Sequence, residues 1–281
     1  MQSAHYTYRV PRLCIERTRR QWHLTIRAPI ANNERPLGTL KTLGPIFSLC
    51  ADSGGRIAAA DANQFAYGLD VYDQPISLGA SPSFSLATSA LPLYCSFDPV
   101  GNLYVTTFFD GANYSDIDVF FAPVRPGTAV GKRIPLNYQD HTRGLTADRN
   151  GNVFISNDRG IVEYSSLSTG NNIVARFGNS ENGNIIRMGP DGNLYVDEGH
   201  SFHVYDAPFH SGQSFTRAIA VPLCSSLDMF IDSFAFDSAG DMILSCGFSS
   251  GTLLELAPPY TGPPIGVTSM TFPAQDIVVA P

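Results

Sequence analysis

Polar side chains recur at one position of this sequence, six residues after a turn glycine, where a predicted strand ends. The position holds Asp61, Thr107, Asn157, Glu198 and Cys246. Carboxylate and amide oxygens are the ligands that hard divalent cations prefer. If the fold brings Asp61, Asn157 and Glu198 together, they could therefore bind Ca²⁺ or another divalent ion. Alternatively, these side chains hydrogen-bond neighbouring backbone and water.

Further acids and two histidines lie in or beside the loops that follow these strand ends. They are Asp110, Asp140, His141, Asp158, Asp197 and His200. An Asp–His pair such as Asp140 and His141 has the residue types of a general base and its orienting group. No serine or cysteine has the surroundings of a nucleophile, so no catalytic residue is assigned. The whole set is predicted to form one ligand-binding face, which should attract cations or basic ligands because acids outnumber bases there.

A repeated turn positions these residues. Variants of Asp-x-x-Gly occur five times, with an apolar strand before and after each copy, and the turn glycines are spaced 46, 50, 41 and 48 residues apart. These glycines are Gly55, Gly101, Gly151, Gly192 and Gly240. An aspartate can accept the N–H groups of a tight turn, and glycine supplies a positive φ. We therefore interpret Asp52, Asp98, Asp148 and Asp237 as turn residues and not as ligands.

A second motif follows each turn, as in Leu69-Asp-Val-Tyr-Asp-Gln-Pro75. Its fourth position is large and apolar or aromatic in every copy, which indicates packing between sheets. The residues at this position are Ile26, Tyr72, Phe120, Tyr164, Tyr205 and Leu256. The proline that ends most copies cannot donate to a strand ladder and so ends the strand.

Repeats of 40–50 residues with four strands each are typical of propeller blades. The outer motif occurs six times and the inner motif five, and residues 276–280 resemble a further inner strand. The prediction is an all-β fold, a six-bladed β-propeller of four-stranded antiparallel blades. Its closing blade would be shared by the two termini, with outer strands from residues 22–45. Residues 22–281 would form a single domain, preceded by a poorly ordered basic leader at 1–21.

The segments GNLYV and VYxAP, as in Gly101–Val105 and Val204–Pro208, resemble the NHL-repeat family of β-propellers, which is related to the gluconolactonase and regucalcin-like group. The resemblance covers residues 22–281. It implies a binding module for a protein, peptide or glycan. The alternative that it implies is a divalent-metal-dependent hydrolase or lyase, of the gluconolactonase-like or amidating-lyase-like type. The Glu-Gly-Pro segment of gluconolactonase-like proteins is absent here, which weakens that alternative.

The composition of the chain limits the classes of partner that the protein is expected to bind. With 18 basic and 25 acidic residues, the net charge of −7 disfavours nucleic acid. Five cysteines without a CxxC pair disfavour a zinc knuckle, and Cys50 and Cys95 fall in predicted inner strands as small buried side chains. A monomer that binds a protein, peptide or glycan is expected, although a purely structural repeat domain is a third interpretation.

The sequence leaves the compartment open. No run of 18 apolar residues exists, so no membrane-spanning helix is expected. The first 20 residues contain five arginines and lack the apolar core of a signal peptide. An extracellular location would require an upstream segment.

Overall fold

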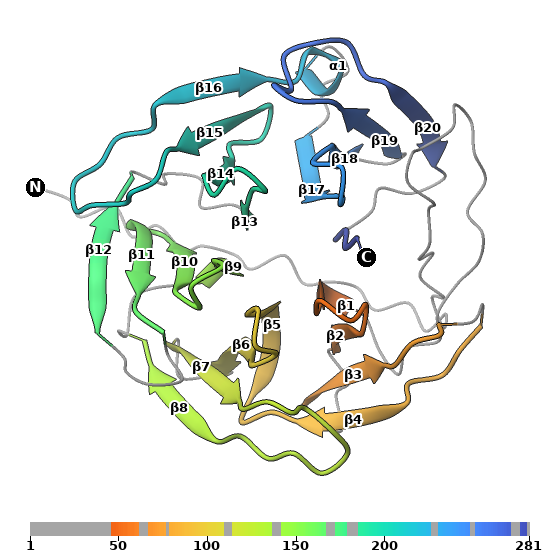
Figure 1. Cartoon of the computed structure of the whole chain (residues 1–281), viewed down its shortest axis with the longest axis vertical. Helices are drawn as coiled ribbons and strands as arrows, with labels where there is room; N and C mark the ends of the chain where they lie inside the picture. The colour runs from red at the N-terminus through yellow and green to blue at the C-terminus, as the bar shows by residue number, and fades with distance from the viewer. Residues whose placement is uncertain are drawn as a thin grey trace, which may run out of the picture.

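The computed structural model describes residues 46–61, 67–76, 79–109, 114–136, 142–166, 172–178, 185–225, 230–247, 251–270 and 276–279. These residues form five antiparallel four-stranded sheets arranged as a ring (Figure 1). In each sheet the strands follow one another in chain order, so each sheet is one blade of a β-propeller. Among the described residues, no helix has the length and apolar character needed to cross a bilayer.

Blade 1 contains β1 (Ile46–Ala51), β2 (Ile57–Asp61), β3 (Gly68–Tyr72) and β4 (Phe84–Ala87); blade 2 contains β5 (Leu91–Phe97), β6 (Leu103–Phe109), β7 (Tyr114–Phe120) and β8 (Lys132–Pro135). Blade 3 contains β9 (Thr142–Ala147), β10 (Val153–Asn157), β11 (Gly160–Tyr164) and β12 (Ile173–Phe177); blade 4 contains β13 (Ile186–Met188), β14 (Leu194–Asp197), β15 (Ser201–Tyr205) and β16 (Arg217–Ala220). A short helix, α1 (Pro222–Ser225), leads to blade 5, which contains β17 (Phe230–Phe236), β18 (Met242–Gly247), β19 (Gly251–Leu256) and β20 (Gly266–Met270).

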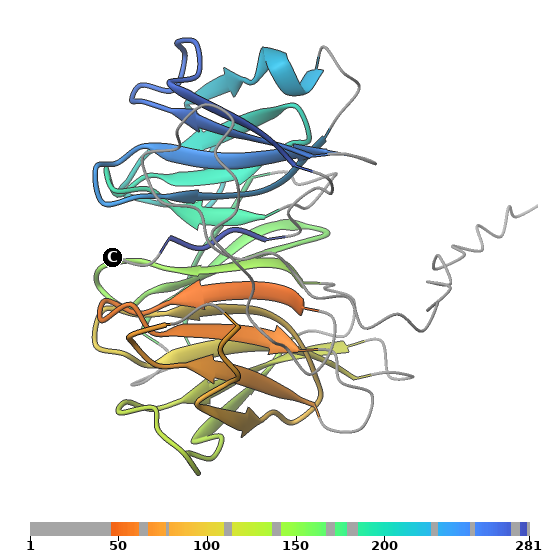
Figure 2. The same ribbon diagram turned by 90° about the vertical axis from the view of Figure 1, so that its right-hand side faces the viewer.

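The Asp-x-x-Gly segments are the turns between the first and second strands of the blades, as the sequence predicts. In blade 2, Asp98 Oδ1 accepts the backbone N–H groups of Val100 and Asn102 at 3.1 and 2.9 Å. Gly101 has a φ of 89°, a conformation that glycine adopts without steric cost. We call the face that carries these turns the turn face, and the opposite face the loop face. Figure 2 shows the blades edge-on, with the strands running between the two faces.

The predicted packing position is confirmed in the described blades. Its side chains are buried between sheets, with exposed fractions of 2% for Tyr72, 0% for Phe120, 8% for Tyr164, 2% for Tyr205 and 4% for Leu256. Ile26, the sixth member, lies outside the described residues. Apolar clusters continue from one blade to the next: Phe202 of blade 4, for example, packs edge-on against Phe234 of blade 5 at 4.7 Å between ring centroids. The hydrophobic core therefore consists of the apolar layers between neighbouring blades, which we call seams.

The prediction of six blades is wrong. The structure has five four-stranded sheets in its described residues, and residues 276–279, expected as an inner strand, have no regular secondary structure. The expected outer strands at 22–45 and the leader at 1–21 lie outside the described residues. The inner-strand resemblance of residues 276–280 led to the error, because an apolar segment can fill a seam without joining a ladder.

The segment at 276–279 does lie in the seam between blades 5 and 1. The side chains of Ile277 and Val279 pack against Ile243 and Leu253, and Val278 packs against the apolar cluster of blade 1. Apolar burial therefore accounts for its position, and Figure 1 shows its end inside the ring.

Two disulfide bonds join the four described cysteines. Cys50 on β1 is bonded to Cys95 on β5, so a covalent link crosses the seam between blades 1 and 2. Cys224 of α1 is bonded to Cys246 of β18. The expected burial of Cys50 and Cys95 is confirmed, with exposed fractions of 7% and 2%, but the two are a pair and not separate thiols.

Candidate functional site

The second strand of each blade starts at its turn and ends on the loop face. Asp61 ends β2, Asn157 ends β10, and Asp197 ends β14 with Glu198 directly after it. The strand order thus places these predicted residues at the loop-face ends of three blades. Asp110, Asp140 and His141 lie outside the described residues. That the whole set forms one site, and that Asp61, Asn157 and Glu198 bind a metal, stays a prediction.

In blade 3 the described part of the loop face is basic, and its acid Asp158 is already paired. Asn157 Oδ1 accepts the N–H of Arg159 at 2.9 Å, which closes the tight turn between β10 and β11. Asp158 forms an ion pair with Arg143 at 2.8 Å. A pocket of about 230 Å³ beside this turn is lined by Arg159 and Arg176 together with Asn157 and the apolar start of β11. Asn157 and Asp158 are therefore turn and ion-pair residues in this structure.

In blade 4 the corresponding turn is acidic and buried. The exposed fraction of Asp197 is 4%, and its Oδ1 accepts the N–H of Gly199 at 2.6 Å. Burial, together with the negative charges of Glu198 and Asp232, raises the pKa of Asp197 to about 7, against the lowering effect of the Gly199 hydrogen bond. Burial also raises the pKa of Glu198.

Asp232 completes this acidic group from the neighbouring blade and was not among the predicted residues. It lies on β17, and burial raises its pKa to about 7. Its Oδ2 has no hydrogen-bond partner among the described residues. The two blades meet where Ile231 N–H donates to the carbonyl oxygen of Gly199 at 2.7 Å. The strand start Ile231-Asp-Ser233 matches no motif. An acid near the start of an inner strand was the one feature of the sequence that could have pointed to Asp232. We call Asp197, Glu198 and Asp232 the seam acids.

The two histidines of this region have different surroundings. The ring of His203 stacks on Phe215 with centroids 3.8 Å apart, and its Nδ1 lies 3.6 Å from Glu198 Oε1. Burial lowers the pKa of His203, so the imidazole is neutral at pH 7. His203 is therefore a packing residue of blade 4. His200 lies in the loop and its backbone carbonyl accepts the N–H of Val221 at 3.1 Å.

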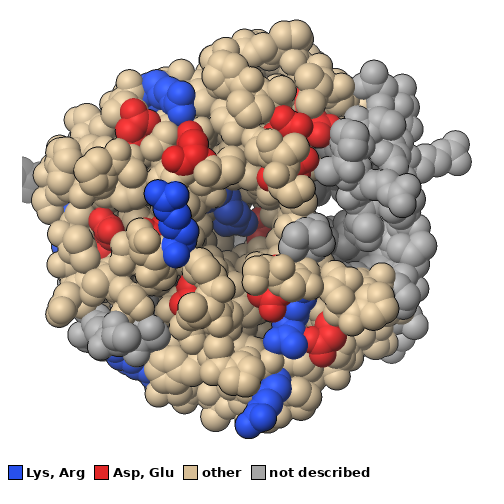
Figure 3. Space-filling model, in the orientation of Figure 1, with Lys and Arg blue, Asp and Glu red and all other residues tan. Residues whose placement is uncertain are grey.

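At the centre of the ring, Asp276 bonds three inner strands at once. Its Oδ2 accepts the N–H of Leu49 on β1 at 2.7 Å. Its Oδ1 accepts Arg187 Nη2 from β13 at 2.8 Å and Ser233 Oγ from β17 at 2.7 Å. Figure 3 shows basic atoms in the central opening of the turn face. Burial together with the charge of Asp276 raises the pKa of Tyr94 on β5. The centre is therefore a closed polar network with its acids and bases paired.

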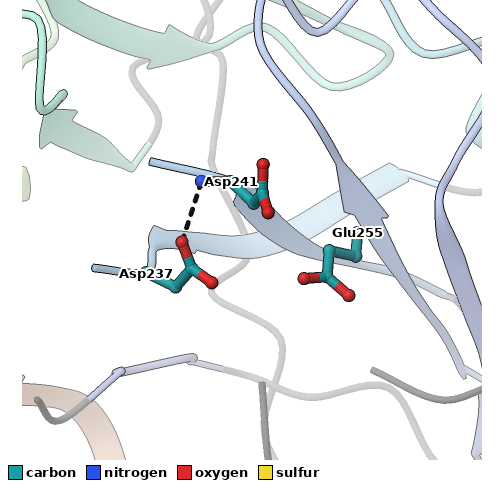
Figure 4. Close-up of side chains that lie close together, drawn as sticks. All are labelled: Asp237, Asp241 and Glu255. Atoms are coloured by element: carbon teal, nitrogen blue, oxygen red, sulfur yellow. Dashed lines mark hydrogen bonds between the residues drawn. The ribbon is translucent and has the colours of Figure 1, made fainter. Parts of the chain in front are cut away.

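One candidate metal centre lies in blade 5. Asp237 and Asp241 from the turn and Glu255 from β19 bring ligand oxygens within 4.8 Å of one another (Figure 4). Asp237 Oδ1 accepts the N–H of Asp241 at 2.8 Å, so one oxygen serves the turn. Three carboxylates at this separation suit a hard cation such as Ca²⁺. Within the described part of the chain, no other three His, Cys, Asp or Glu side chains meet that distance.

No known family model matches the sequence, and no curated protein matches it. Solved structures do. A protein of unknown function from Bacteroides caccae aligns with a TM-score of 0.53 and 12% identity over 80% of this chain and 86% of that chain. Hydrazine synthase from Kuenenia stuttgartiensis aligns with a TM-score of 0.54 and 12% identity over 77% of this chain, but over only 64% of that chain, less than two thirds. At this identity the likeness shows the fold alone. The chain is a β-propeller, and membership of the NHL-repeat family stays a prediction.

Proposed function

We propose that this propeller is a binding module that holds a basic segment of a partner protein or peptide against the seam acids of the loop face. A propeller is a rigid scaffold on which recognition residues project from loops, and this fold is consistent with such a role. The observation that carries the proposal is the gathering of three acids where Ile231 of blade 5 meets Gly199 of blade 4, and burial raises the pKa of each. Among the described residues no lysine or arginine forms an ion pair with these three carboxyls, so a ligand that brings a cation would stabilise their charged forms.

The charge distribution of the loop face supports a basic peptide over a glycan. A neutral glycan would leave the seam acids without a counter-charge. Blade 3 next to them presents Arg143, Arg159 and Arg176, of which Arg143 is paired with Asp158. A partner with lysine or arginine at one end and an acid at the other would match both halves of the face.

The test is a binding titration with a lysine-rich peptide, a glutamate-rich peptide of equal length and a neutral oligosaccharide. The lysine-rich peptide should bind, and the double variant Asp197→Asn/Asp232→Asn should weaken it at least tenfold. Asp206→Asn is the matched control, because it removes one acid from the same blade outside the seam acids. Equal binding by the double variant and the control, or preference for the oligosaccharide, would contradict the proposal.

The metal-dependent hydrolase or lyase is the second candidate. It rests on the three oxygens of Asp237, Asp241 and Glu255, which lie on the turn face and not among the seam acids. Calcium titration of wild type and Glu255→Gln, followed by a lactone and peptide-amide turnover screen, separates the two candidates. Metal-dependent turnover that Glu255→Gln abolishes would favour the enzyme.

A further inference from the structure

A pocket of about 610 Å³ opens on the turn face between blades 3 and 4. Blade 3 contributes the turn residues 148–150, Asn152 and Glu163. Blade 4 contributes residues 188–192 and 207–209. The volume lies within the range of small-molecule sites. This pocket is separate from the seam acids, which lie on the opposite face of the ring.

Glu163 is the buried acid of this pocket. It lies on β11 between Phe154 of β10 and Ala175 of β12, its partners in the strand register. Its exposed fraction is 6%, and its Oε2 has no hydrogen-bond partner among the described residues. A carboxyl that is held among apolar side chains without a partner is costly, so such an arrangement calls for a compensating ligand.

The fold does not require an acid at this position. The equivalent residues of blades 1, 2 and 4 are Val71, Val119 and Val204, each with an exposed fraction of 0%. Asp118 of blade 2, with an exposed fraction of 0%, shows how this scaffold can satisfy a buried acid. Asp118 accepts Ser89 N–H at 2.7 Å, Ser89 Oγ at 2.9 Å and Arg133 Nε at 3.4 Å. Glu163 is therefore an addition to the blade that packing does not explain.

The other acids of the pocket are committed to turns. Asp148 accepts the N–H groups of Asn150 and Asn152, each at 2.8 Å. Asp191 accepts Tyr195 Oη at 2.9 Å and Asn193 Nδ2 at 2.9 Å. Asp191 also forms an ion pair with Arg217 at 3.4 Å. The pocket is still acidic, because Asp148, Glu163 and Asp191 line it and Arg149, which is exposed, is its basic lining residue. An anionic ligand would be repelled, and a cation would be attracted.

The remaining walls are apolar. Met188, Pro190, Pro208 and Phe209 line the side that blade 4 provides. Phe209 is held in place by stacking on Phe177 at 5.5 Å and by an edge contact with Phe154 at 5.0 Å between ring centroids. A fully hydrated metal ion would gain nothing from these walls, whereas an organic cation could bury carbon against them.

We infer that this pocket binds an organic ammonium ion with an apolar body, whose N–H donates to the carboxyl group of Glu163 while the carbon part packs on Phe209 and Met188. The ammonium could belong to a free amine or to a lysine side chain of a peptide, since both present the same group.

The pH dependence follows from the surroundings of Glu163. Burial, together with the charge of Asp148, raises the pKa of Glu163 to about 7. The charged groups that face it are Asp148, Arg149 and Asp191, while β10 and β12 present Phe154 and Ala175. A bound ammonium favours the carboxylate, so binding below pH 7 releases the proton that the empty pocket holds. Affinity should therefore fall as the pH falls from 8 to 5.5, approaching about tenfold per pH unit.

Calorimetric titration with phenethylammonium tests the inference, with phenethyl alcohol as the neutral probe and an acetylated Gly-Lys-Gly amide as the lysine source. The amine should bind wild type at pH 8 and the alcohol should not. Glu163→Val and Glu163→Gln should each weaken amine binding at least tenfold. Asp73→Asn, which removes an acid of blade 1 that is paired with Arg56 and lies outside the pocket, should leave it unchanged.

The variants also guard against a folding artefact. Glu163→Val introduces the residue that three other blades already carry, and far-ultraviolet circular dichroism checks that both Glu163 variants are folded. Tighter binding of the peptide than of the free amine assigns the site to a lysine side chain, and the reverse assigns it to a small amine. Equal amine binding by folded Glu163→Val and wild type, equal binding of the alcohol, or no binding of either amine by wild type would each overturn the inference.

Discussion

Blades 2 and 4 complete their first turns differently from blade 3. In blade 2, Tyr104 Oη donates to the turn acid Asp98 at 2.8 Å, and the residue opposite the tyrosine in the register is Val119. Blade 4 repeats this with Tyr195, Asp191 and Val204. A hydroxyl group thus satisfies the acid while the facing position stays apolar.

In blade 3 both residues are exchanged. Phe154 takes the place of the tyrosine and has no hydroxyl, and the facing residue is Glu163. Blade 5 does the same with Ile243 and Glu255. The exchange removes the tyrosine hydroxyl and places a second acid near the acid of the turn. In blade 3 both acids line the pocket, and in blade 5 both belong to the acidic cluster. The comparison teaches that one blade design keeps the facing position apolar, whereas the other places a buried carboxyl there.

The largest expected effect comes from placing a glutamate in blade 4 at the position that faces its tyrosine, as blade 3 has it opposite Phe154. Val204→Glu should destabilise the protein by about 3–5 kcal/mol at pH 8, because it buries a carboxylate without a partner beside Tyr195. The loss should shrink at pH 5, where the carboxyl is protonated. Urea unfolding at both pH values measures it. A loss below about 1 kcal/mol would mean that the blade tolerates the acid and that the comparison has no energetic basis.

The reverse exchange should stabilise the protein. The folded pKa of Glu163, about 7, is raised above the ordinary value of 4.5 for a glutamate. Its carboxyl therefore costs nothing below the unfolded pKa and destabilises the fold as pH rises through 7. Glu163→Val should gain about 2–3 kcal/mol at pH 8 and little at pH 4.5. Unfolding curves across that window give the answer, and a gain that does not change with pH would point to packing alone.

Removing the hydroxyl from the first design should cost less. Tyr195→Phe loses the hydrogen bond to Asp191 and should lower the free energy of unfolding by about 1 kcal/mol. Tyr104→Phe in blade 2 is the matched change and should cost a similar amount. Chemical denaturation of both variants tests the pair. If only one of them loses stability, the two blades do not share one design.

The smallest effect concerns the turn of blade 5. The residue after the turn glycine is asparagine in blades 2, 3 and 4 but Asp241 in blade 5, where burial and the charge of Asp237 raise its pKa. Asp241→Asn should raise stability by about 0.5 kcal/mol at pH 7 without added cations, by removing one like charge. Added Ca²⁺ should narrow the difference if the three acids bind it, and thermal melts with and without chelator show this.

The sequence predicted the repeat well because its signals are local. Turn chemistry at Asp98 and Gly101 and the buried fourth position at Tyr72 or Phe120 follow from neighbouring residues. The blade count failed because residues 276–279 combine strand-like apolar spacing with contacts that no local pattern reports. The Cys50–Cys95 pair links strands of different blades, so its spacing alone could not identify it.

The candidate site was predicted only in part. Strand order placed Asp197 and Glu198 on the loop face, but Asp232 belongs to a strand start with no motif. Glu163 was within reach of the sequence: the aligned outer motif reads Val, Val, Glu, Val and Glu at its third position in blades 1 to 5. Attention to the fourth, aromatic position hid it. The signal was an acid at a motif position that is valine in blades 1, 2 and 4.

The two seams on either side of blade 1 differ in how they would give way under force. Among the described residues, a covalent bond between Cys50 and Cys95 joins one seam, whereas hydrogen bonds to Asp276 and the packing of Ile277, Val278 and Val279 join the other. Hydrogen bonds break and re-form on thermal timescales, and a disulfide does not. Fluctuations of the ring should therefore gather at the joint between blades 5 and 1. Under load, the ring should open first at this non-covalent seam, while the disulfide-linked seam stays closed.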